Sequence, residues 1–187
     1  KLTTLPQEIL GAISVPFKQT TAQISGKFSV WRDRNLNIDE IIAENEEETV
    51  ERLFNDVLFA DDGDNIIARQ NNIEIFLEKF DELRLKYYPQ SFKFKQDRHS
   101  ASCYLFFYAP ETNYIYRYSE AEAFAQHIEF GKDIGSGQYF RLDYYYEMCD
   151  KVVETLKEHQ SLLEKHFTFL NEKHFKDESL HLLAFDV

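Results

Sequence analysis

The sequence predicts a helix-rich α+β domain in which a small antiparallel sheet packs against several helices. Three observations support this fold class. Residues 92–118 are rich in aromatic side chains and alternate in polarity at both ends, as half-buried strands do. Apolar residues at helical spacing occur in most of the chain on either side of this stretch. Six glycines and four prolines among 187 residues provide few turns, which favours long helices over a many-stranded sandwich.

The first third of the chain predicts short elements. Residues 22–32 alternate loosely around a glycine and predict a strand that can join the sheet. Asn37 and Glu40 have the spacing of a capping box, so a helix starts there. We expect this helix to break near Asn45 and to continue as a second segment to Ala60.

A turn and a long amphipathic helix follow. Residues 61–65, with the sequence DDGDN, predict the turn, and they lack the ligand spacing of an EF-hand calcium loop. Residues 72–87 carry apolar side chains at helical spacing, and Pro89 ends the helix.

The stretch 92–118 predicts a three-stranded meander. Residues 92–95 (FKFK) and 113–118 alternate between apolar and polar side chains. Residues 104–108 are apolar throughout, as in a central strand that is buried on both faces. Short connections between three consecutive strands favour an antiparallel arrangement.

Residues 119–187 predict the helical part of the domain. Ser119 and Glu122 have capping-box spacing and start a helix that lasts to about Ile128. Residues 131–137 (GKDIGSG) predict a flexible loop, and a helix then runs from residue 142 or 143 to about 166, with Glu147 and Lys151 paired on its outer face. One or two further helices complete the chain.

The length fits a single domain, with residues 65–90 leading from helix into the meander and residues 119–187 forming the helical part. The sequence starts at Lys1 and stops inside the apolar run 180–187. We therefore expect a fragment of a larger protein. We also expect an exposed apolar patch at 182–187, where the rest of that protein or a second copy docks.

Composition excludes several classes of protein. A formal net charge of −12 disfavours non-specific binding to nucleic acid, because Lys and Arg supply most of the affinity for phosphate. The longest apolar runs are shorter than a membrane span, and no signal-peptide pattern is present. Cys103 and Cys149 are too few for a disulfide scaffold, which predicts buried reduced thiols in a cytoplasmic protein.

Two groups of side chains are candidates for a binding surface. A basic island interrupts the acidic chain and is interleaved with aromatic residues. Three tyrosines share one face of the last predicted strand, and an arginine sits in a second aromatic cluster at 139–146. Either group can equally be a solvated helix end or part of the core. The candidate residues are Arg84, Lys86, Lys93, Lys95, Arg98, Tyr114, Tyr116, Tyr118 and Arg141.

Motifs for catalysis, metal binding or cofactor binding are not found. The glycine-rich loop fails the phosphate-binding pattern, because Lys132 follows its first glycine and Gln138 follows its last. Four histidines recur at intervals of seven or eight residues, a spacing that places helical neighbours about 10 Å apart, too far to share one zinc ion. We therefore name no catalytic residue, no metal ligand and no cofactor.

Three functional hypotheses follow. The first is a non-catalytic recognition or scaffold domain of a larger cytosolic protein, whose partner is the rest of the polypeptide or another protein, with no membrane involved. The alternative is a nucleic-acid or modified-base recognition domain that uses the basic island 84–98 and the tyrosine face 114–118. The third is an enzyme with an unfamiliar site near Asp97, His99 and the glycine loop.

Overall fold

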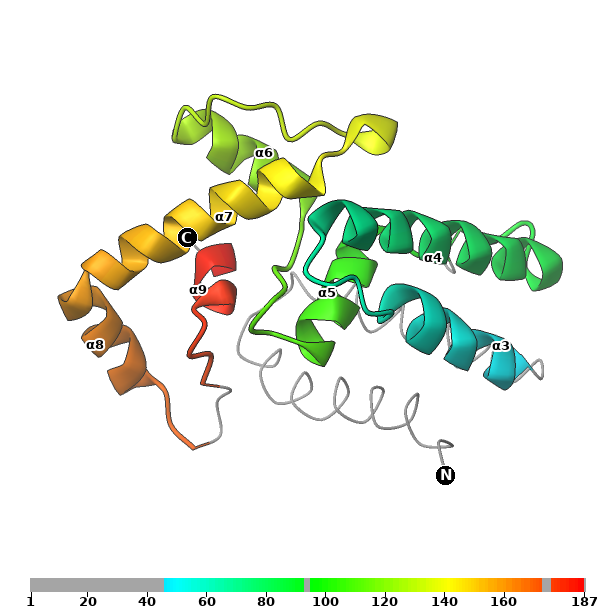
Figure 1. Cartoon of the computed structure of the whole chain (residues 1–187), viewed down its shortest axis with the longest axis horizontal. Coiled ribbons are helices and arrows are strands. Elements are labelled where there is room, and N and C mark those ends of the chain that lie inside the picture. Colours follow the sequence, from blue (N-terminus) through cyan, green and yellow to red (C-terminus); the bar gives the residue numbers. More distant parts are fainter. Residues whose placement is uncertain (1–45, 93–94, 173–175, 187) are drawn as a thin grey trace. The chain divides into compact units, whose positions relative to one another are not determined.

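The computed structural model describes residues 46–92, 95–172 and 176–186, and every regular element within them is a helix (Figure 1). The α+β prediction is therefore wrong, because these residues form no strand and no sheet. The strand expected at 22–32 and the capping box at 37–40 lie outside the described ranges. The chain divides into two compact units, residues 1–101 and 102–187, and the boundary falls inside helix α5 (Arg98–Tyr108).

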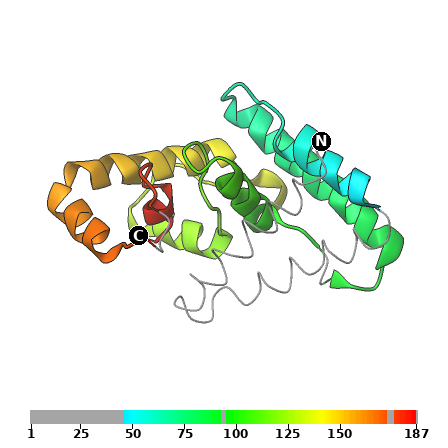
Figure 2. The same ribbon diagram turned by 90° about the horizontal axis from the view of Figure 1, so that it is seen from below.

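The first unit contains a short helical segment that packs against a long helix. The segment consists of α3 (Glu47–Arg52), which continues directly into the π-helix η2 (Leu53–Leu58). The long helix is α4 (Ile66–Tyr87), and the two views in Figures 1 and 2 both show α3 lying along it. The predicted helical segment to Ala60 and the predicted helix over 72–87 are confirmed, the second starting at Ile66.

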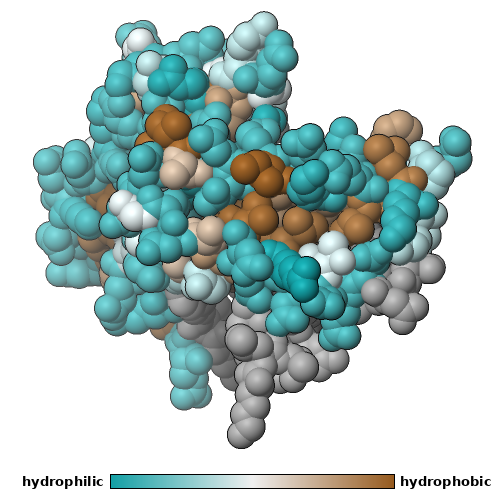
Figure 3. Space-filling model, turned by 45° about the vertical axis from the view of Figure 1, so that its right-hand side comes forward, coloured by the Kyte–Doolittle hydropathy of each residue, from teal (hydrophilic) through white to brown (hydrophobic). Residues whose placement is uncertain are grey.

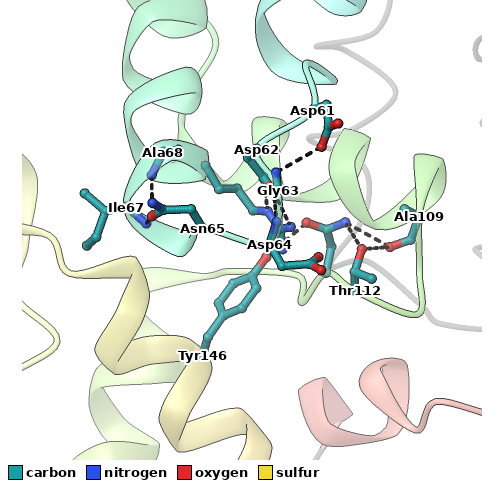
Figure 4. A network of polar contacts seen from close by, with 12 residues as sticks. Asp61, Asp62, Gly63, Asp64, Asn65, Ile67, Ala68, Ala109, Thr112 and Tyr146 are labelled. Carbon is teal, nitrogen blue, oxygen red and sulfur yellow. Dashed lines mark hydrogen bonds and ion pairs between the residues drawn. The ribbon is translucent and has the colours of Figure 1, made fainter.

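Helix α4 begins early because Asn65 caps it. The Asn65 side chain accepts hydrogen bonds from the backbone N–H of Ile67 at 3.0 Å and of Ala68 at 3.2 Å (Figure 4). Asp62, in the turn before it, forms an ion pair of 2.6 Å with Arg69 in the first turns of α4. The two Asn65 bonds satisfy N–H groups that a helix start otherwise leaves without partners, and the ion pair holds the preceding turn against α4.

The core of this pairing is aromatic. Phe54 of η2 meets Phe76 of α4 edge-to-face, with ring centroids 5.1 Å apart, and Phe76 contacts Phe80 at 5.5 Å. The buried residues of α4 recur at helical spacing, so one stripe of the helix faces η2. The buried apolar side chains of these elements are Val50, Leu53, Phe54, Leu58, Ile73, Phe76, Phe80 and Leu83.

The predicted meander is replaced by helix α5 and an extended segment. Asp97 and Ser100 cap the start of α5 reciprocally: the Asp97 carboxylate accepts from the Ser100 N–H at 2.9 Å, and the Ser100 hydroxyl oxygen accepts from the Asp97 N–H at 2.8 Å. The apolar run 104–108, predicted to be a central strand, is the second half of this helix, buried at 104–106 and exposed at Tyr108. Residues 93–94 of the first predicted strand lie outside the described ranges.

The second unit continues from α5 into a series of helices. A single helix expected over 142–166 is broken at His159, where the backbone leaves helical geometry. The last helix lies beside α7 in both views (Figures 1 and 2). The elements are α6 (Tyr118–His127), η4 (Gly137–Tyr139), α7 (Leu142–Glu158), α8 (Gln160–Phe169) and α9 (His181–Asp186).

Two local predictions in this unit have different outcomes. The helix expected at Ser119 is present, but its N-cap is Arg117 without a side-chain cap, and the Ser119 hydroxyl donates to Glu120 instead. The pair of Lys151 and Glu147 is confirmed, at 3.2 Å.

The side chains of 182–185, expected to be an exposed patch, are half-buried. Within the described ranges, no helix combines the length and apolarity that a membrane crossing requires.

Candidate functional site

Arg84, from the predicted basic island, is a buried structural residue. Its guanidinium Nε donates to the Asp81 carboxylate at 2.5 Å, and its Nη1 donates to the backbone carbonyl of Ser91 at 3.1 Å. Arg84 also lowers the pKa of Asp81, mainly through this hydrogen bond. A buried charge needs such partners. Of the island's two lysines in the first predicted strand, Lys95 is exposed and Lys93 is not described.

Lys86 and Arg98 of the basic island each bind a carboxylate of their own unit. The Lys86 ammonium donates to Glu46 at 2.6 Å. The Arg98 guanidinium binds Glu74 through two bonds of 2.6 Å and 2.7 Å. These ion pairs neutralise charge that a phosphate backbone would otherwise contact.

The three predicted tyrosines do not share one exposed face. Tyr114 and Tyr116 are buried, whereas Tyr118 is the first residue of α6 and is 42% exposed. The Tyr116 ring lies between Phe140 at 4.4 Å and Tyr145 at 5.0 Å, so it is part of the core. The predicted strand therefore contributes two of its tyrosines to the interior.

Side chains take the place of a neighbouring strand along residues 113–116. The Tyr116 N–H donates to the Ser102 hydroxyl oxygen at 2.9 Å, and the Tyr114 N–H donates to the Tyr146 hydroxyl oxygen at 3.3 Å. The Ile115 carbonyl accepts from the Tyr145 hydroxyl at 2.5 Å. Buried backbone groups need partners, and here helices supply them through side chains.

Asn113 anchors the start of this segment. Its side-chain amide nitrogen donates to the Ala109 carbonyl at 2.9 Å and to the Thr112 hydroxyl at 3.1 Å, and its amide oxygen accepts from the Tyr146 hydroxyl at 3.2 Å (Figure 4). These bonds close the turn after α5 and fix where the extended segment begins.

Two tyrosine hydroxyls and one thiol buried in and near this network are held in their protonated forms. Burial raises the pKa of the Tyr114 hydroxyl, which also donates to Asp150 at 2.7 Å, and burial likewise raises the pKa of Tyr145. Burial raises the pKa of the Cys149 thiol to about 12. All three groups stay protonated near neutral pH, whereas a general base or thiolate nucleophile requires a pKa near or below it.

Exposed aromatic side chains indicate a contact surface more directly than these buried groups do. On the face drawn in Figure 3, apolar side chains reach the surface in a group among hydrophilic ones. In the described part of the chain the most exposed aromatic residues are Phe92 (81%), Phe169 (80%) and Tyr139 (74%). Phe92 adjoins residues that are not described, and Phe169 ends α8. Tyr139 differs from these two residues because it lies in a loop whose backbone is fixed on both sides of it.

The loop of residues 131–141 is closed by its own backbone. The Arg141 N–H donates to the Ile134 carbonyl at 2.9 Å, which brings the two ends of the turn together. Between them Gly135 has φ +64°, and a Cβ there would lie 2.0 Å from the Tyr139 carbonyl oxygen. Only glycine allows this approach. Ile134 and Phe140 are buried, so the loop is anchored on both sides of the exposed Tyr139.

Cationic and aromatic side chains flank this loop. The Arg141 guanidinium lies 4.0 Å from the centre of the Tyr144 ring, and the Lys132 ammonium lies 4.9 Å from the same centre. Asp143 binds Arg141 at 2.6 Å, and Glu147 binds Lys132. Lys132 and Lys151 lower the pKa of Glu147 by hydrogen bonding. Tyr139, Lys132, Arg141 and Tyr144 are named together as the loop surface.

Of the predicted site residues, the loop surface contains Arg141. Lys132, Tyr139 and Tyr144 are missing from the predicted set, although the sequence shows them in the glycine-rich loop and the second aromatic cluster. The useful signal was the pair of glycines, Gly135 and Gly137, directly before Gln138 and Tyr139. Both glycines have positive φ, and glycine turns of this kind run over the protein surface.

No group of three or more His, Cys, Asp or Glu side chains is placed to hold a metal ion within residues 46–92, 95–172 and 176–186. Comparison of the chain with protein-family models, curated proteins and solved structures finds no match.

Proposed function

We propose that this chain is a non-catalytic recognition domain of a larger protein and that it contacts a protein partner through the loop surface. The observation that carries the proposal is the exposure of Tyr139, 74%, on a loop whose adjacent residue Phe140 is buried. The closed loop keeps a large apolar ring exposed to water. Binding of a partner that covers this ring is favourable, because it removes apolar surface from water.

The neighbouring side chains suit a protein partner. Tyr and Arg are the residue types that most often dominate the binding energy of protein interfaces. The stacking of Arg141 on Tyr144 and its ion pair with Asp143 limit its rotamers before binding. Less side-chain entropy is then lost when a partner binds.

The charges of the loop surface favour a protein over nucleic acid. Lys132 and Arg141 are each bound to a carboxylate, and so are Arg84, Lys86 and Arg98 of the basic island. A binding site for phosphate would present cations that are not already neutralised. The nucleic-acid hypothesis remains a prediction that these contacts do not favour.

A cytoplasmic location is part of the same proposal. Cys103 and Cys149 are both buried thiols and form no disulfide. This state is typical of proteins in reducing compartments.

Site-specific photo-crosslinking tests the proposal. A photoreactive phenylalanine derivative is placed at position 139 of the full chain in cells of the source organism, and at position 169 as a control of similar exposure. We expect a protein that crosslinks at 139 and not at 169. With that protein purified, Tyr139→Ala should weaken binding about tenfold or more in calorimetry, and Phe169→Ala less than twofold. Equal crosslinking at both positions, or no effect of Tyr139→Ala, would contradict the proposal.

A further inference from the structure

The C-terminal residues 176–186, named here the strap, place the ring of His181 over the ring of Tyr114 in a tilted stack. The ring centroids are 4.0 Å apart with an interplanar angle of 33°. The His181 Nδ1 lies 3.0 Å from the backbone carbonyl oxygen of Asn113. A carbonyl only accepts, so Nδ1 carries the proton and donates to it. One planar ring thus makes both a stacking contact and a directed hydrogen bond.

The surface under His181 is held by contacts from α7. The Tyr114 hydroxyl donates to Asp150 at 2.7 Å, and the Tyr146 ring meets the Tyr114 ring edge-to-face at 5.1 Å. The Tyr146 hydroxyl also donates to the Asn113 side chain. These contacts fix the Tyr114 ring and the Asn113 backbone independently of the strap.

The strap in turn carries its own local structure. The Asp177 carboxylate accepts from the backbone N–H groups of Ser179 at 3.0 Å and of Leu182 at 2.6 Å, and it also binds the Ser179 hydroxyl. These bonds cap α9 from within the strap. The α9 backbone is therefore satisfied locally, so separation of the strap does not depend on rebuilding that cap.

The strap contacts the rest of its unit along α7 and at residues 110–114, and one of its residues has an unfavourable backbone conformation. Besides the His181 contacts, the Ser179 hydroxyl reaches the Pro110 carbonyl at a long 3.4 Å, and the side chains of 182–185 are only half-buried. Leu180 is buried but has φ +67°, a left-handed conformation that a residue with a Cβ rarely adopts. Separation of the strap would expose Leu180 and the covered parts of residues 182–185.

We propose that the strap is releasable and that His181 occupies, from within the chain, a binding position for a planar ring with an N–H donor. On release, Tyr114 offers the stacking face and the Asn113 carbonyl offers the acceptor. Imidazole, indole and similar heterocycles have this chemistry, either as a side chain of another polypeptide or as a free molecule. This site is separate from the loop surface, so the two proposals stand or fall independently.

Hydrogen exchange of the unmodified full chain tests whether the strap is releasable. The amides of Leu182 and Ala184 are hydrogen-bonded within the strap, to Asp177 and to the Leu180 carbonyl. We expect both to exchange at least tenfold faster than buried amides of α7, with a smaller denaturant dependence that marks local opening. Exchange of both amides only together with α7 would overturn the proposal.

Ligand binding to a His181→Gly variant tests the ring position. 4-Methylimidazole, which matches the deleted side chain, should bind at millimolar concentration, shift the resonances of Tyr114 and slow exchange in the strap. His159→Gly is the matched control, because the His159 ring contacts the Thr155 carbonyl at an exposed helix end. No binding to His181→Gly, or equal binding to both variants, would overturn the ring position.

A peptide of residues 176–186 distinguishes the source of the ring. If the peptide displaces 4-methylimidazole from His181→Gly, a chain-borne ring is supported. If 4-methylimidazole binds and the peptide does not compete, a free heterocycle is supported.

Discussion

The hydroxyl of Tyr145 donates a 2.5 Å hydrogen bond to the backbone carbonyl of Ile115, thirty residues earlier in the chain. This contact joins the middle of the extended segment to the first turns of α7. Tyr145 is buried, and its hydroxyl satisfies a carbonyl that a second strand would satisfy in a sheet. A side chain from a helix therefore determines where this segment lies.

Removal of that hydroxyl should destabilise the chain. In Tyr145→Phe the Ile115 carbonyl stays buried and loses its donor, which costs about 1–3 kcal/mol. Denaturant unfolding followed by circular dichroism measures the change. Tyr139→Phe is the control, because its ring is exposed, and we expect a change within about 0.5 kcal/mol. Equal effects of the two substitutions would show that the bond does not contribute.

The closed loop predicts an asymmetry between two glycines. In Gly135→Ala the new Cβ would meet the Tyr139 carbonyl oxygen at 2.0 Å, so the loop must open, at a cost of about 2–3 kcal/mol. Gly137 also has positive φ, but open space surrounds its Cβ position. Gly137→Ala should cost only about 1 kcal/mol, from backbone strain. Thermal unfolding of both variants measures the difference, and a larger cost at Gly137 would contradict the loop geometry.

Gly135→Ala should also weaken partner binding if the loop surface is the contact site. The partner identified by crosslinking at position 139 provides the assay. We expect binding to fall at least as much as in Tyr139→Ala, because opening the loop displaces Tyr139 and Arg141 together. Unchanged affinity would separate the loop's structural role from recognition.

The helices with clear apolar periodicity could be predicted from sequence, and the aromatic stretch could not. Residues 72–87 and 142–158 repeat apolar side chains at helical spacing, and both are helical. Residues 104–108 are apolar throughout, a pattern that a buried strand and a buried helix share. The local signal that separates them is the pair Asp97 and Ser100, which forms a reciprocal cap three residues apart.

The extended segment shows a second limit of the sequence. Residues 113–116 have the alternation and the aromatic content of a strand, and they lie between helices α5 and α6 without regular secondary structure. Whether such a segment joins a sheet depends on what lies beside it. Here the partners are hydroxyl groups of Ser102, Tyr145 and Tyr146, and their spacing in the sequence does not reveal this. For the same reason Tyr114 and Tyr116, two of the three tyrosines predicted as a binding face, are part of the core.

The cap of α5 can be tested directly. Asp97→Ala removes the acceptor for the Ser100 N–H and should destabilise the first unit by about 1 kcal/mol. Asp97→Asn keeps an acceptor at the same position and should cost less than half as much. The free energies of unfolding of the two variants measure the difference. Equal losses would mean that the charge of Asp97, rather than its cap, matters.

An ion pair between Glu46, at the start of α3, and Lys86, near the end of α4, joins the two helices. It predicts that the stability of the folded chain falls in acid. Glu46 accepts from Lys86 at 2.6 Å and from the Tyr87 hydroxyl at 2.5 Å. The hydrogen bond from Lys86, followed by that from Tyr87, lowers the pKa of Glu46 to about 2, from an ordinary value of 4.5. The unfolded chain therefore binds a proton at Glu46 at a higher pH than the folded chain does.

The stabilisation from Glu46 is accordingly complete above about pH 4.5 and is lost as the pH falls towards 2. Lys86 is exposed, and solvent screens the pair, so we expect Glu46→Gln to lower the melting temperature by about 2–4 °C at pH 7. The difference from the unmodified chain should shrink steadily between pH 4.5 and pH 2. Glu82→Gln, which breaks the exposed pair of Lys79 and Glu82 within α4, is the control and should have a smaller effect at pH 7. A difference for Glu46→Gln that is independent of pH would show that the carboxylate charge does not fasten α3 to α4.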